Sequence, residues 1–259
     1  MSGGFRFDGR VAIVTGGTRG VGRGIALALL DAGAEVAICG RKPPETPVEA
    51  SGRTALFLPC DVRAADQAAA LVNDVAQRFG RLDLLVNNAG GSPVADAATA
   101  SPRFSESIIA LNLIGPLHLS QAANKIMQAQ PEGGSIVNIA SVSGTRPSPT
   151  TAAYGAAKAG LLNLTQSLAM EWGPKVRVNA IIAGLIVTES AGMHYGSDEA
   201  VKRIGGMLPA RRMAVPADIA ATVLFLASPA AAYVSGAHLA VHGGGERPSF
   251  LGLADVAGT

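Results

Sequence analysis

The chain has 259 residues, 48% of them apolar and 15% charged, so it can bury a large core while leaving a rather apolar surface. The formal net charge is +2 and no run of Lys or Arg occurs, so we expect neither nucleic acid nor a membrane as a partner. No stretch approaches the ~18 uninterrupted apolar residues of a membrane span, and no signal peptide is recognisable, which favours the cytoplasm. Cys39 and Cys60 are expected to be core thiols in a reducing compartment, with a disulfide as the alternative.

Short β-rich runs alternate with longer helical patterns, which is typical of a parallel sheet covered by helices on both faces. The expected strands are Val11–Thr15, Glu35–Cys39, Ala55–Pro59, Leu82–Val86, Ser135–Ala140, Val176–Ile182 and His238–Val241. The expected helices are Val21–Asp31, Ala65–Phe79, Ser105–Gln128, Ala152–Trp172 and Pro216–Ala227. We therefore predict an α/β fold with a single doubly wound, Rossmann-like parallel sheet of about seven strands.

No repeat, linker or low-complexity segment interrupts this alternation, so we expect residues 1–259 to form one domain. Two segments depart from this alternation of strands and helices. Pro43–Ser51 is Pro-rich and is expected to be a surface loop. Residues 185–208 carry a weak helical pattern between glycine-containing breaks and are expected to form a substrate lid. The tail, residues 246–259, is expected to cover a pocket or to contact a neighbouring subunit.

The first expected strand runs into a glycine-rich turn that precedes a helix. The turn consists of Thr15, Gly16, Gly17, Thr18, Arg19, Gly20, Val21 and Gly22. Its glycines let the backbone turn tightly and approach a pyrophosphate, whose charge then meets the helix N-terminus. The spacing differs from Gly-x-Gly-x-x-Gly, and the Lys-Ser/Thr of a Walker loop is missing, which argues against a nucleoside triphosphatase. The turn indicates dinucleotide binding.

The residues after the second strand bear on which dinucleotide binds. A carboxylate about 20 positions beyond the turn would bind the ribose 2′-hydroxyl of NAD. Here Gly40 is followed by Arg41 and Lys42. Arg41 could pair with a 2′-phosphate, and Arg19 could add a second contact. We predict NADP, with NAD as the alternative; solvated loop cations are the other explanation of these residues.

Tyr154 and Lys158 lie four residues apart in an expected helix, so their side chains share one face. A free tyrosine ionises near pH ~10. An ammonium about 4 Å away, at an effective dielectric constant of about 20, would favour the phenolate by up to ~4 kcal/mol. Lys158 would thereby lower the pKa of Tyr154 towards neutrality, where a general acid or base works best. An ordinary amphipathic helix would also contain such a pair.

Together these motifs resemble the short-chain dehydrogenase/reductase family over nearly the whole chain, with a general likeness to its 3-oxoacyl-thioester reductases. The turn Thr15–Gly22 is similar to the family's Thr-Gly-x-x-x-Gly-x-Gly. Asp61-Val62 is similar to the pair that contacts adenine. Residues 87–90, Asn-Asn-Ala-Gly, match the motif that follows the family's fourth strand. Several ordered motifs at the family's spacing are far more specific than any one alone.

The resemblance implies the residues of the site. Its catalytic residues would be Asn112, Ser141, Tyr154 and Lys158. Tyr154 would transfer the proton, Ser141 would donate a hydrogen bond to the developing oxyanion, and Lys158 would also bind ribose hydroxyls. Asn112 would hold a water linked to Lys158. The cofactor-binding residues would be Gly16, Thr18, Arg19, Gly20, Val21, Gly22, Arg41, Asp61, Val62, Asn88, Ala89, Gly90, Tyr154, Lys158, Ala183, Gly184 and Thr188.

Two positions depart from the family pattern. The Pro-Gly after the sixth strand is replaced by Ala183-Gly184, for which we expect a looser turn. The Asp before the final glycines is replaced by His242, at a position expected to lie away from the hydride-transfer centre. Neither departure removes a catalytic group.

The expected function is that of an NADP(H)-dependent oxidoreductase interconverting a secondary alcohol and a ketone. An acyl thioester and a bulky hydrophobic, steroid-like molecule are both admissible substrates. The alternative is a non-catalytic dinucleotide sensor or scaffold of the same fold. The histidines are too scattered for a metal site and no Cys-x-x-Cys occurs, so we expect no metal. The resemblance implies a homotetramer or homodimer.

Overall fold

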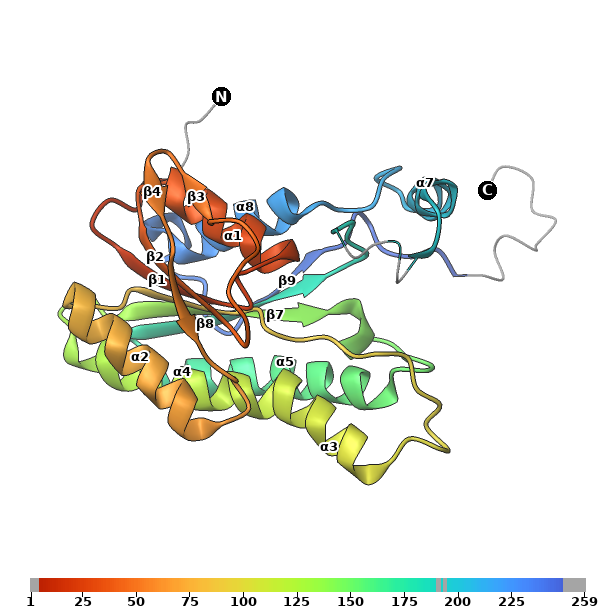
Figure 1. The fold of residues 1–259 in the computed structure, drawn as a ribbon, viewed down its shortest axis with the longest axis horizontal. Coiled ribbons are helices and arrows are strands. Elements are labelled where there is room, and N and C mark those ends of the chain that lie inside the picture. Colours follow the sequence, from red (N-terminus) through yellow and green to blue (C-terminus); the bar gives the residue numbers. More distant parts are fainter. Residues whose placement is uncertain (1–4, 190–191, 193–194, 249–259) are drawn as a thin grey trace.

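The computed structural model describes residues 5–189, 192 and 195–248. Seven strands form one parallel sheet in the order β5-β2-β1-β6-β7-β8-β9 (Figure 1). Their bounds are Val11–Thr15 (β1), Glu35–Gly40 (β2), Leu56–Pro59 (β5), Leu84–Asn87 (β6), Gly134–Ser141 (β7), Val176–Ala183 (β8) and His238–Val241 (β9). The predicted doubly wound parallel sheet is confirmed.

Helices cover both faces of this sheet. In Figure 1, α1 and α8 lie above it, whereas α2, α3, α4 and α5 lie below. The helices are α1 (Gly20–Asp31), α2 (Ala65–Phe79), α3 (Pro102–Ile109), α4 (Gly115–Ala129), α5 (Ala152–Trp172), α7 (Asp198–Met207) and α8 (Pro216–Ala227), with short η1 (Ala110–Ile114), η2 (Val142–Gly144) and η3 (Pro229–Ala231). Among the described residues, none of these helices combines the length and apolar character that a membrane crossing requires.

The central strands are buried on both faces, which is why they appear in the sequence as continuous apolar runs. Successive side chains of β1 point to opposite sides. Val14 belongs to the core cluster that includes Leu29 of α1, whereas Ile13 belongs to the cluster that includes Leu71 of α2 and Leu119 of α4. Each such side chain stabilises the fold by about 1.5–3 kcal/mol when fully buried. The sheet is thereby fixed between two hydrophobic layers.

The expected helix over Ser105–Gln128 is present, but it is not a regular α-helix throughout. The chain forms α3 from Pro102 onward, with the hydroxyl oxygen of Ser101 accepting a hydrogen bond from Phe104 N at 3.2 Å. A π-helical turn, η1, then separates α3 from α4. Pro116 lacks the N–H that a regular α-helix would direct at the carbonyl of Asn112, so the regular ladder cannot continue through this turn.

The expected loop Pro43–Ser51 is also partly wrong. Its end forms β3 (Glu49–Ala50), which pairs antiparallel with β4 (Arg53–Thr54). Arg23 of α1 holds the preceding part of the segment, because its guanidinium donates hydrogen bonds to carbonyl oxygens of that segment. In the proposed lid, α7 is a regular helix, while residues 190, 191, 193 and 194 lie outside the described part, as do tail residues 249–259. The lid and the tail therefore remain predictions.

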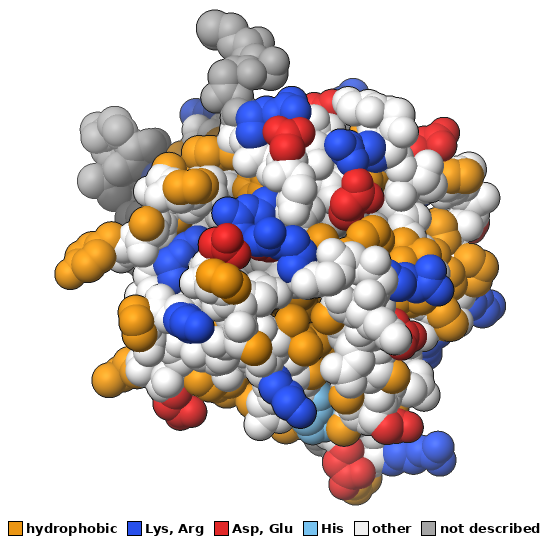
Figure 2. Space-filling model, turned by 90° about the vertical axis from the view of Figure 1, so that its left-hand side faces the viewer, with side chains coloured by type: hydrophobic (Ala, Val, Ile, Leu, Met, Phe, Trp, Pro, Cys, Tyr) orange, Lys and Arg blue, Asp and Glu red, His pale blue; other side chains and the backbone are white. Residues whose placement is uncertain are grey.

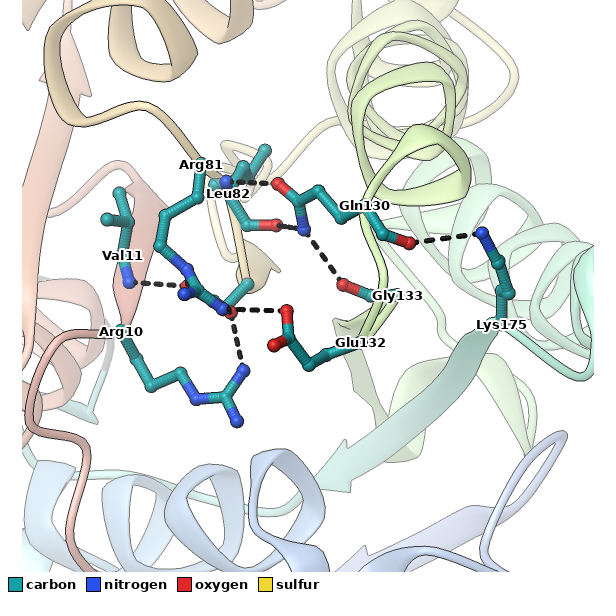
Figure 3. Close-up of polar contacts among 9 residues, drawn as sticks. Arg10, Val11, Arg81, Leu82, Gln130, Glu132, Gly133 and Lys175 are labelled. Atoms are coloured by element: carbon teal, nitrogen blue, oxygen red, sulfur yellow. Dashed lines mark hydrogen bonds and ion pairs between the residues drawn. The ribbon is translucent and has the colours of Figure 1, made fainter.

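The edge where β1, β6 and β7 begin carries a cluster of paired charges (Figure 3). The buried carboxylate of Asp83 accepts hydrogen bonds from Arg10 (2.7 Å), from Arg81 (2.6 and 2.8 Å) and from Val11 N (2.9 Å). Arg81 also contacts Glu132 at 3.3 Å. Figure 2 views the molecule from this side and shows basic and acidic side chains lying beside one another on it. We call Arg10, Arg81, Asp83 and Glu132 the amino-edge cluster.

Candidate active site

A large cleft lies at the opposite edge of the sheet, where the parallel strands end. The strand order reverses between β1 and β6, and a ligand crevice is expected at such a point in a doubly wound sheet. The predicted residues that line the cleft are Gly16, Thr18, Arg19, Gly20, Val21, Gly22, Arg41, Asp61, Val62, Asn88, Ala89, Gly90, Ser141, Tyr154, Lys158, Ala183, Gly184 and Thr188. Asn112 is buried behind them. Residues predicted from separate motifs thus meet in one place.

The glycine-rich turn packs closely against the residues that follow β6 and is hydrogen-bonded to them. Gly16 has a φ of +64°, and a Cβ on Gly22 would lie 2.3 Å from the Gly16 carbonyl oxygen. The side chain of Asn88 donates a hydrogen bond to the Thr15 carbonyl at 2.8 Å. In return, the Thr15 hydroxyl accepts hydrogen bonds at 2.9 Å from the backbone N–H groups of Asn88 and Ala89. The turn therefore needs its glycines for close packing as well as for access to a ligand.

A carboxylate occupies the N-terminus of the helix that follows this turn. Gly20 N donates a hydrogen bond to Glu189 Oε2 at 3.1 Å. Because α1 has no acidic residue in its own first turn, Glu189 supplies the negative charge that a helix N-terminus favours. One carboxylate oxygen thus accepts a hydrogen bond from a backbone N–H at the end of the turn where a pyrophosphate is expected to bind. Glu189 was not predicted from the sequence, because no local signal links residues so far apart.

The far end of the cleft carries the residues expected to select the dinucleotide. Arg41 is exposed immediately after β2, as predicted. Asp61 follows β5 and is bound by Arg63, whose hydrogen bonds hold the pKa of Asp61 below its ordinary value; the charge of Arg41 adds to the same effect. Cys39 and Cys60 are free buried thiols, so the core-thiol prediction is confirmed and the disulfide alternative is wrong.

Tyr154 and Lys158 lie side by side on α5. The Lys158 ammonium is 5.7 Å from the centre of the Tyr154 ring. Lys158 is 3% exposed and donates a hydrogen bond to the Ile139 carbonyl of β7 at 2.7 Å. Ser141, at the end of β7, is hydrogen-bonded to the Tyr154 side chain. The expected juxtaposition of phenol, ammonium and serine hydroxyl is present.

The expected lowering of the Tyr154 pKa is wrong for this structure. Burial raises the pKa of Tyr154, and the hydrogen bond with Ser141 offsets only part of that effect. Burial also lowers the pKa of Lys158 to about 8. The expectation counted the charge of the ammonium and omitted the desolvation of both groups, which favours their neutral forms. Tyr154 is therefore held as a protonated phenol, the form that can donate a proton.

Asn112 lies in η1 and is fully buried. Its amide donates to the carbonyls of Gly91 (3.0 Å) and Ile108 (2.9 Å), while its oxygen accepts from Gly91 N at 2.9 Å. A Cβ on Gly90 would lie 2.6 Å from that oxygen and 3.3 Å from Lys158 Nζ. Gly90 thus allows Asn112 to lie close to Lys158. The side chain is engaged with backbone, so its expected water-binding role stays a prediction.

A chain of buried polar side chains, which was not predicted from the sequence, joins α5 to the sheet. Asn87 of β6 donates to Asn138 of β7 at 2.8 Å, and Asn138 donates to the Thr165 hydroxyl of α5 at 2.9 Å. Asn138 and Thr165 are both fully buried. Buried polar groups of this kind are costly unless they are paired, so the chain specifies how α5 sits on the sheet. A lone Asn within the apolar run of β7 was the only available signal.

The two departures from the family pattern meet in space. A Cβ on Gly184 would lie 2.7 Å from the Cα of His242, and Gly184 N donates to the Val241 carbonyl at 3.0 Å. The turn at Ala183-Gly184 therefore packs against the end of β9 and against His242. Gly184 lines the cleft, whereas His242 is not among the lining residues, so the looser turn and the remoteness of His242 stay predictions.

Comparison with known proteins identifies the class. The model of a family described as "Enoyl-(Acyl carrier protein) reductase" matches residues 16–246. 2-Dehydro-3-deoxy-D-gluconate 5-dehydrogenase of Escherichia coli (strain K12) is 37% identical over 244 residues, which cover 93% of this chain and 96% of the relative. D-threitol dehydrogenase of Mycolicibacterium smegmatis is 37% identical over 255 residues, which cover 93% and 94%. The structure of Thermoplasma acidophilum aldohexose dehydrogenase superposes with a TM-score of 0.87 at 31% identity, covering 99% and 100%.

The chain belongs to the short-chain dehydrogenase/reductase family. Membership defines an oxidoreductase of alcohol or keto groups that uses a nicotinamide dinucleotide.

Proposed function

We propose that the protein is an NADP(H)-dependent oxidoreductase that interconverts a secondary alcohol and a ketone. The observation that carries this proposal is the position of Tyr154, Lys158 and Ser141 in the same cleft as an anion-accepting turn. A nicotinamide bound there would supply or accept the hydride. Gly20 N–H would bind its pyrophosphate, for which Glu189 now stands in.

Residues of the protein transfer one proton to or from the substrate. In the direction of reduction, the Tyr154 hydroxyl donates its proton to the substrate carbonyl oxygen, and in oxidation the phenolate takes it back. Ser141 donates a hydrogen bond to the same oxygen as negative charge develops on it. Lys158 stabilises the resulting phenolate, because a phenolate about 4–6 Å from an ammonium is favoured electrostatically. Lys158 is buried, whereas Tyr154 is partly exposed in the cleft, where a substrate can reach its hydroxyl.

Replacement of Tyr154 by Phe tests the proposal. We expect kcat to fall by roughly 10²–10⁴-fold, because the variant loses the proton donor. Far-ultraviolet circular dichroism and the affinity for NADPH should not change, since the ring and its packing remain. Near-native turnover by a folded Tyr154→Phe protein would overturn the mechanism. Cofactor binding by wild-type protein that turns over no alcohol or ketone would favour the sensor alternative.

The NADP preference rests on charge at the end of β2. Arg41 is exposed at the cleft, and Arg19 also lines it. Such guanidinium groups pair well with a 2′-phosphate. We expect Arg41→Asp to move the ratio of kcat/KM for NADPH to that for NADH by at least about tenfold towards NADH. Arg78→Asp, which reverses a charge on α2, is the matched control. An unchanged ratio in Arg41→Asp would defeat the NADP proposal.

The relatives bear on the substrate. Their names state that they act on 2-dehydro-3-deoxy-D-gluconate and D-threitol, which are small and hydroxylated. This supports a small polyhydroxylated substrate, either neutral like D-threitol or a carboxylate like the gluconate derivative, over the acyl thioester or steroid-like molecule that the sequence also admits. A panel of alcohols and ketones, assayed by NADPH fluorescence, separates these classes.

Assembly and location are further parts of the proposal. Met170 of α5 and Tyr233 are largely exposed, and Leu239 is exposed on the edge strand β9. Apolar side chains in such positions support a homodimer or homotetramer, which sedimentation velocity would detect. The free thiols of Cys39 and Cys60 support a reducing, cytoplasmic location.

A further inference from the structure

An ion pair joins two segments that are distant in the sequence, and one of its two residues lines the cleft. Arg146 lies in the loop between η2 and α5 and lines the cleft. Its guanidinium donates a hydrogen bond at 2.6 Å to the carboxylate of Glu246, which lies beyond β9 and 100 residues further along the chain. The second nitrogen of Arg146 donates to the Pro147 carbonyl at 3.2 Å. We call Arg146 and Glu246 the mouth pair.

The loop that carries Arg146 packs directly on the catalytic turn of α5. A Cβ on Gly144 would lie 2.7 Å from the carbonyl carbon of Lys158. A Cβ on Gly155, next to Tyr154, would lie 2.9 Å from Ser148 Cβ. With so little space on either side, the loop places Arg146 at a defined position relative to the proton donor.

Tyr195 connects the mouth pair with the catalytic tyrosine electrostatically. It lines the cleft, and burial raises its pKa, an effect to which the negative charge of Glu246 adds. Tyr195 in turn contributes to raising the pKa of Tyr154. Arg146, Tyr195 and Tyr154 all line this cleft, and the loop that carries Arg146 packs on α5 beside Tyr154. A substrate bound in the cleft with its reacting carbon at Tyr154 can therefore extend towards the mouth pair.

The surrounding lining is rich in hydroxyl groups. Ser92, Ser143 and Thr151 line the same cleft as Tyr195. Each hydroxyl can both donate and accept a hydrogen bond, so the lining suits a ligand that carries several hydroxyl groups. A long apolar chain in this place would bury the two charged groups without hydrogen-bonding them, which is unfavourable.

We infer that the mouth pair selects an uncharged, polyhydroxylated substrate, such as a polyol or a sugar. This inference rests on the proposed function. The guanidinium can donate to substrate hydroxyl oxygens, and the carboxylate can accept from substrate hydroxyl groups. Because Glu246 neutralises Arg146, a carboxylate on the substrate gains little attraction there and is repelled by Glu246.

The two side chains are free to exchange partners. Their exposed fractions are 42% for Arg146 and 36% for Glu246, and an ion pair so exposed contributes little to stability. Substrate hydroxyl groups can therefore replace part of the interaction at small cost. For the same reason, variants of the pair are expected to fold.

Glu246→Gln tests the role of the negative charge in the mouth pair, because glutamine keeps the shape of the side chain and removes its charge. Neutral polyols and aldoses, the corresponding sugar acids and cyclohexanol are assayed for kcat/KM with saturating NADP. Wild-type protein should prefer the neutral polyols over the sugar acids. Glu246→Gln should shift this ratio by about tenfold or more towards the acids, because Arg146 becomes an uncompensated cation. Arg146→Gln should weaken turnover of polyols and acids and leave cyclohexanol unchanged.

Asp74→Asn is the matched control, since Asp74 is an exposed acidic residue on α2, outside the cleft lining and the expected lid. Wild-type preference for sugar acids would overturn the inference. An unaltered ratio in Glu246→Gln, with cyclohexanol still oxidised, would overturn it and leave the proposed function standing. Failure of the wild-type protein to oxidise every compound, cyclohexanol included, would instead remove the proposed function and this inference with it.

Discussion

The two edges of the sheet use charge in opposite ways. In the amino-edge cluster, Asp83 is buried and its carboxylate is bound by two arginines and a backbone N–H (Figure 3). Burial raises the pKa of Asp83, but the hydrogen bonds from Arg81, Arg10 and Val11 outweigh it, so that the pKa lies below its ordinary value. At the cleft edge, burial of Lys158 prevails and lowers its pKa to about 8.

The difference agrees with a stabilising role for the amino edge and with the proposed chemistry at the cleft edge. The paired charges at the amino edge favour the native state, because hydrogen bonds from other groups of the protein stabilise their charged forms. Lys158 is held at a cost to stability, as groups in active sites frequently are. Removing a charge at the amino edge should therefore lower stability and leave activity nearly unchanged. Removing the charge of Lys158 at the cleft edge should lower activity and raise stability.

Lys158→Met should have the largest effect. We expect kcat to fall about 10³-fold, because the phenolate of Tyr154 loses its neighbouring charge. At pH 7 the unfolding free energy should nevertheless rise by about 2 kcal/mol, since desolvation of the ammonium, worth about 3 kcal/mol, is relieved and one hydrogen bond to Ile139 is lost. Urea denaturation and steady-state kinetics on the same preparation measure both quantities.

The pH dependence of the unfolding free energy distinguishes relief of desolvation from better packing of the methionine side chain. The pKa of Lys158 is about 8 in the native protein, whereas the ordinary value for a lysine side chain is 10.5. Between these values the unfolded chain binds more protons at this lysine, so wild-type stability rises with pH through that window. The advantage of Lys158→Met should therefore shrink as pH increases from about 8 to 10.5. A constant advantage, or a less stable variant at pH 7, would contradict the assignment.

Asp83→Asn should have the opposite signature. We expect it to lower the unfolding free energy by roughly 3 kcal/mol at pH 7, because Arg10 and Arg81 lose their shared buried partner. Turnover by the folded variant should stay within about twofold of wild type, since residues so far from the reacting groups do not enter the chemistry. A large loss of kcat in the folded variant would show that the edges are coupled.

Acid titration provides the second measurement on Asp83. Because its pKa is lowered in the folded state, the stabilisation is fully present above the ordinary pKa of the carboxyl group and is lost as pH falls through the lowered one. Wild type and Asp83→Asn should thus converge in stability under acid conditions. Asp8→Asn, in an exposed pair with Arg6, is the control and should leave both stability and its pH dependence unchanged.

The sequence predicted most of the sheet because burial on both faces leaves unbroken apolar runs. β1 was predicted residue for residue, and β9 likewise. The π-helical turn within Ser105–Gln128 was not predicted, because the amphipathic periodicity continues through η1 while the turn depends on backbone hydrogen bonding around Pro116. Short pairings such as β3 with β4 depend on a two-residue turn within a Pro-rich segment that indicated only a loop.

The site was predictable where adjacent residues carry the signal and not where distant segments meet. Tyr154 and Lys158 share a helix, so their contact follows from spacing alone. Glu189 reaches Gly20 across 169 residues, and Arg146 reaches Glu246 across 100. The sign of the Tyr154 pKa shift also depended on three-dimensional burial, which no local spacing reports.

The smallest predicted effect concerns the carboxylate at the N-terminus of α1. Glu189 accepts the Gly20 N–H that the proposed function assigns to a pyrophosphate. Glu189→Gln removes the charge that competes with that anion, so we expect the dissociation constant for NADPH to fall by roughly fivefold, as for a charge at a helix end worth about 1 kcal/mol. Fluorescence titration of NADPH measures the change.

Salt dependence distinguishes competition from an altered local conformation. Charge competition is screened, so the gain in Glu189→Gln should diminish between about 0.05 and about 0.5 M salt, whereas a conformational effect should persist. Glu199→Gln on the neighbouring α7 removes an equal charge away from the turn and should leave NADPH affinity unchanged. Weaker binding by Glu189→Gln would mean that this carboxylate assists the cofactor. In that case the cleft edge, like the amino edge, would use its acidic residue as a stabilising partner, and the contrast between the edges would rest on Lys158 alone.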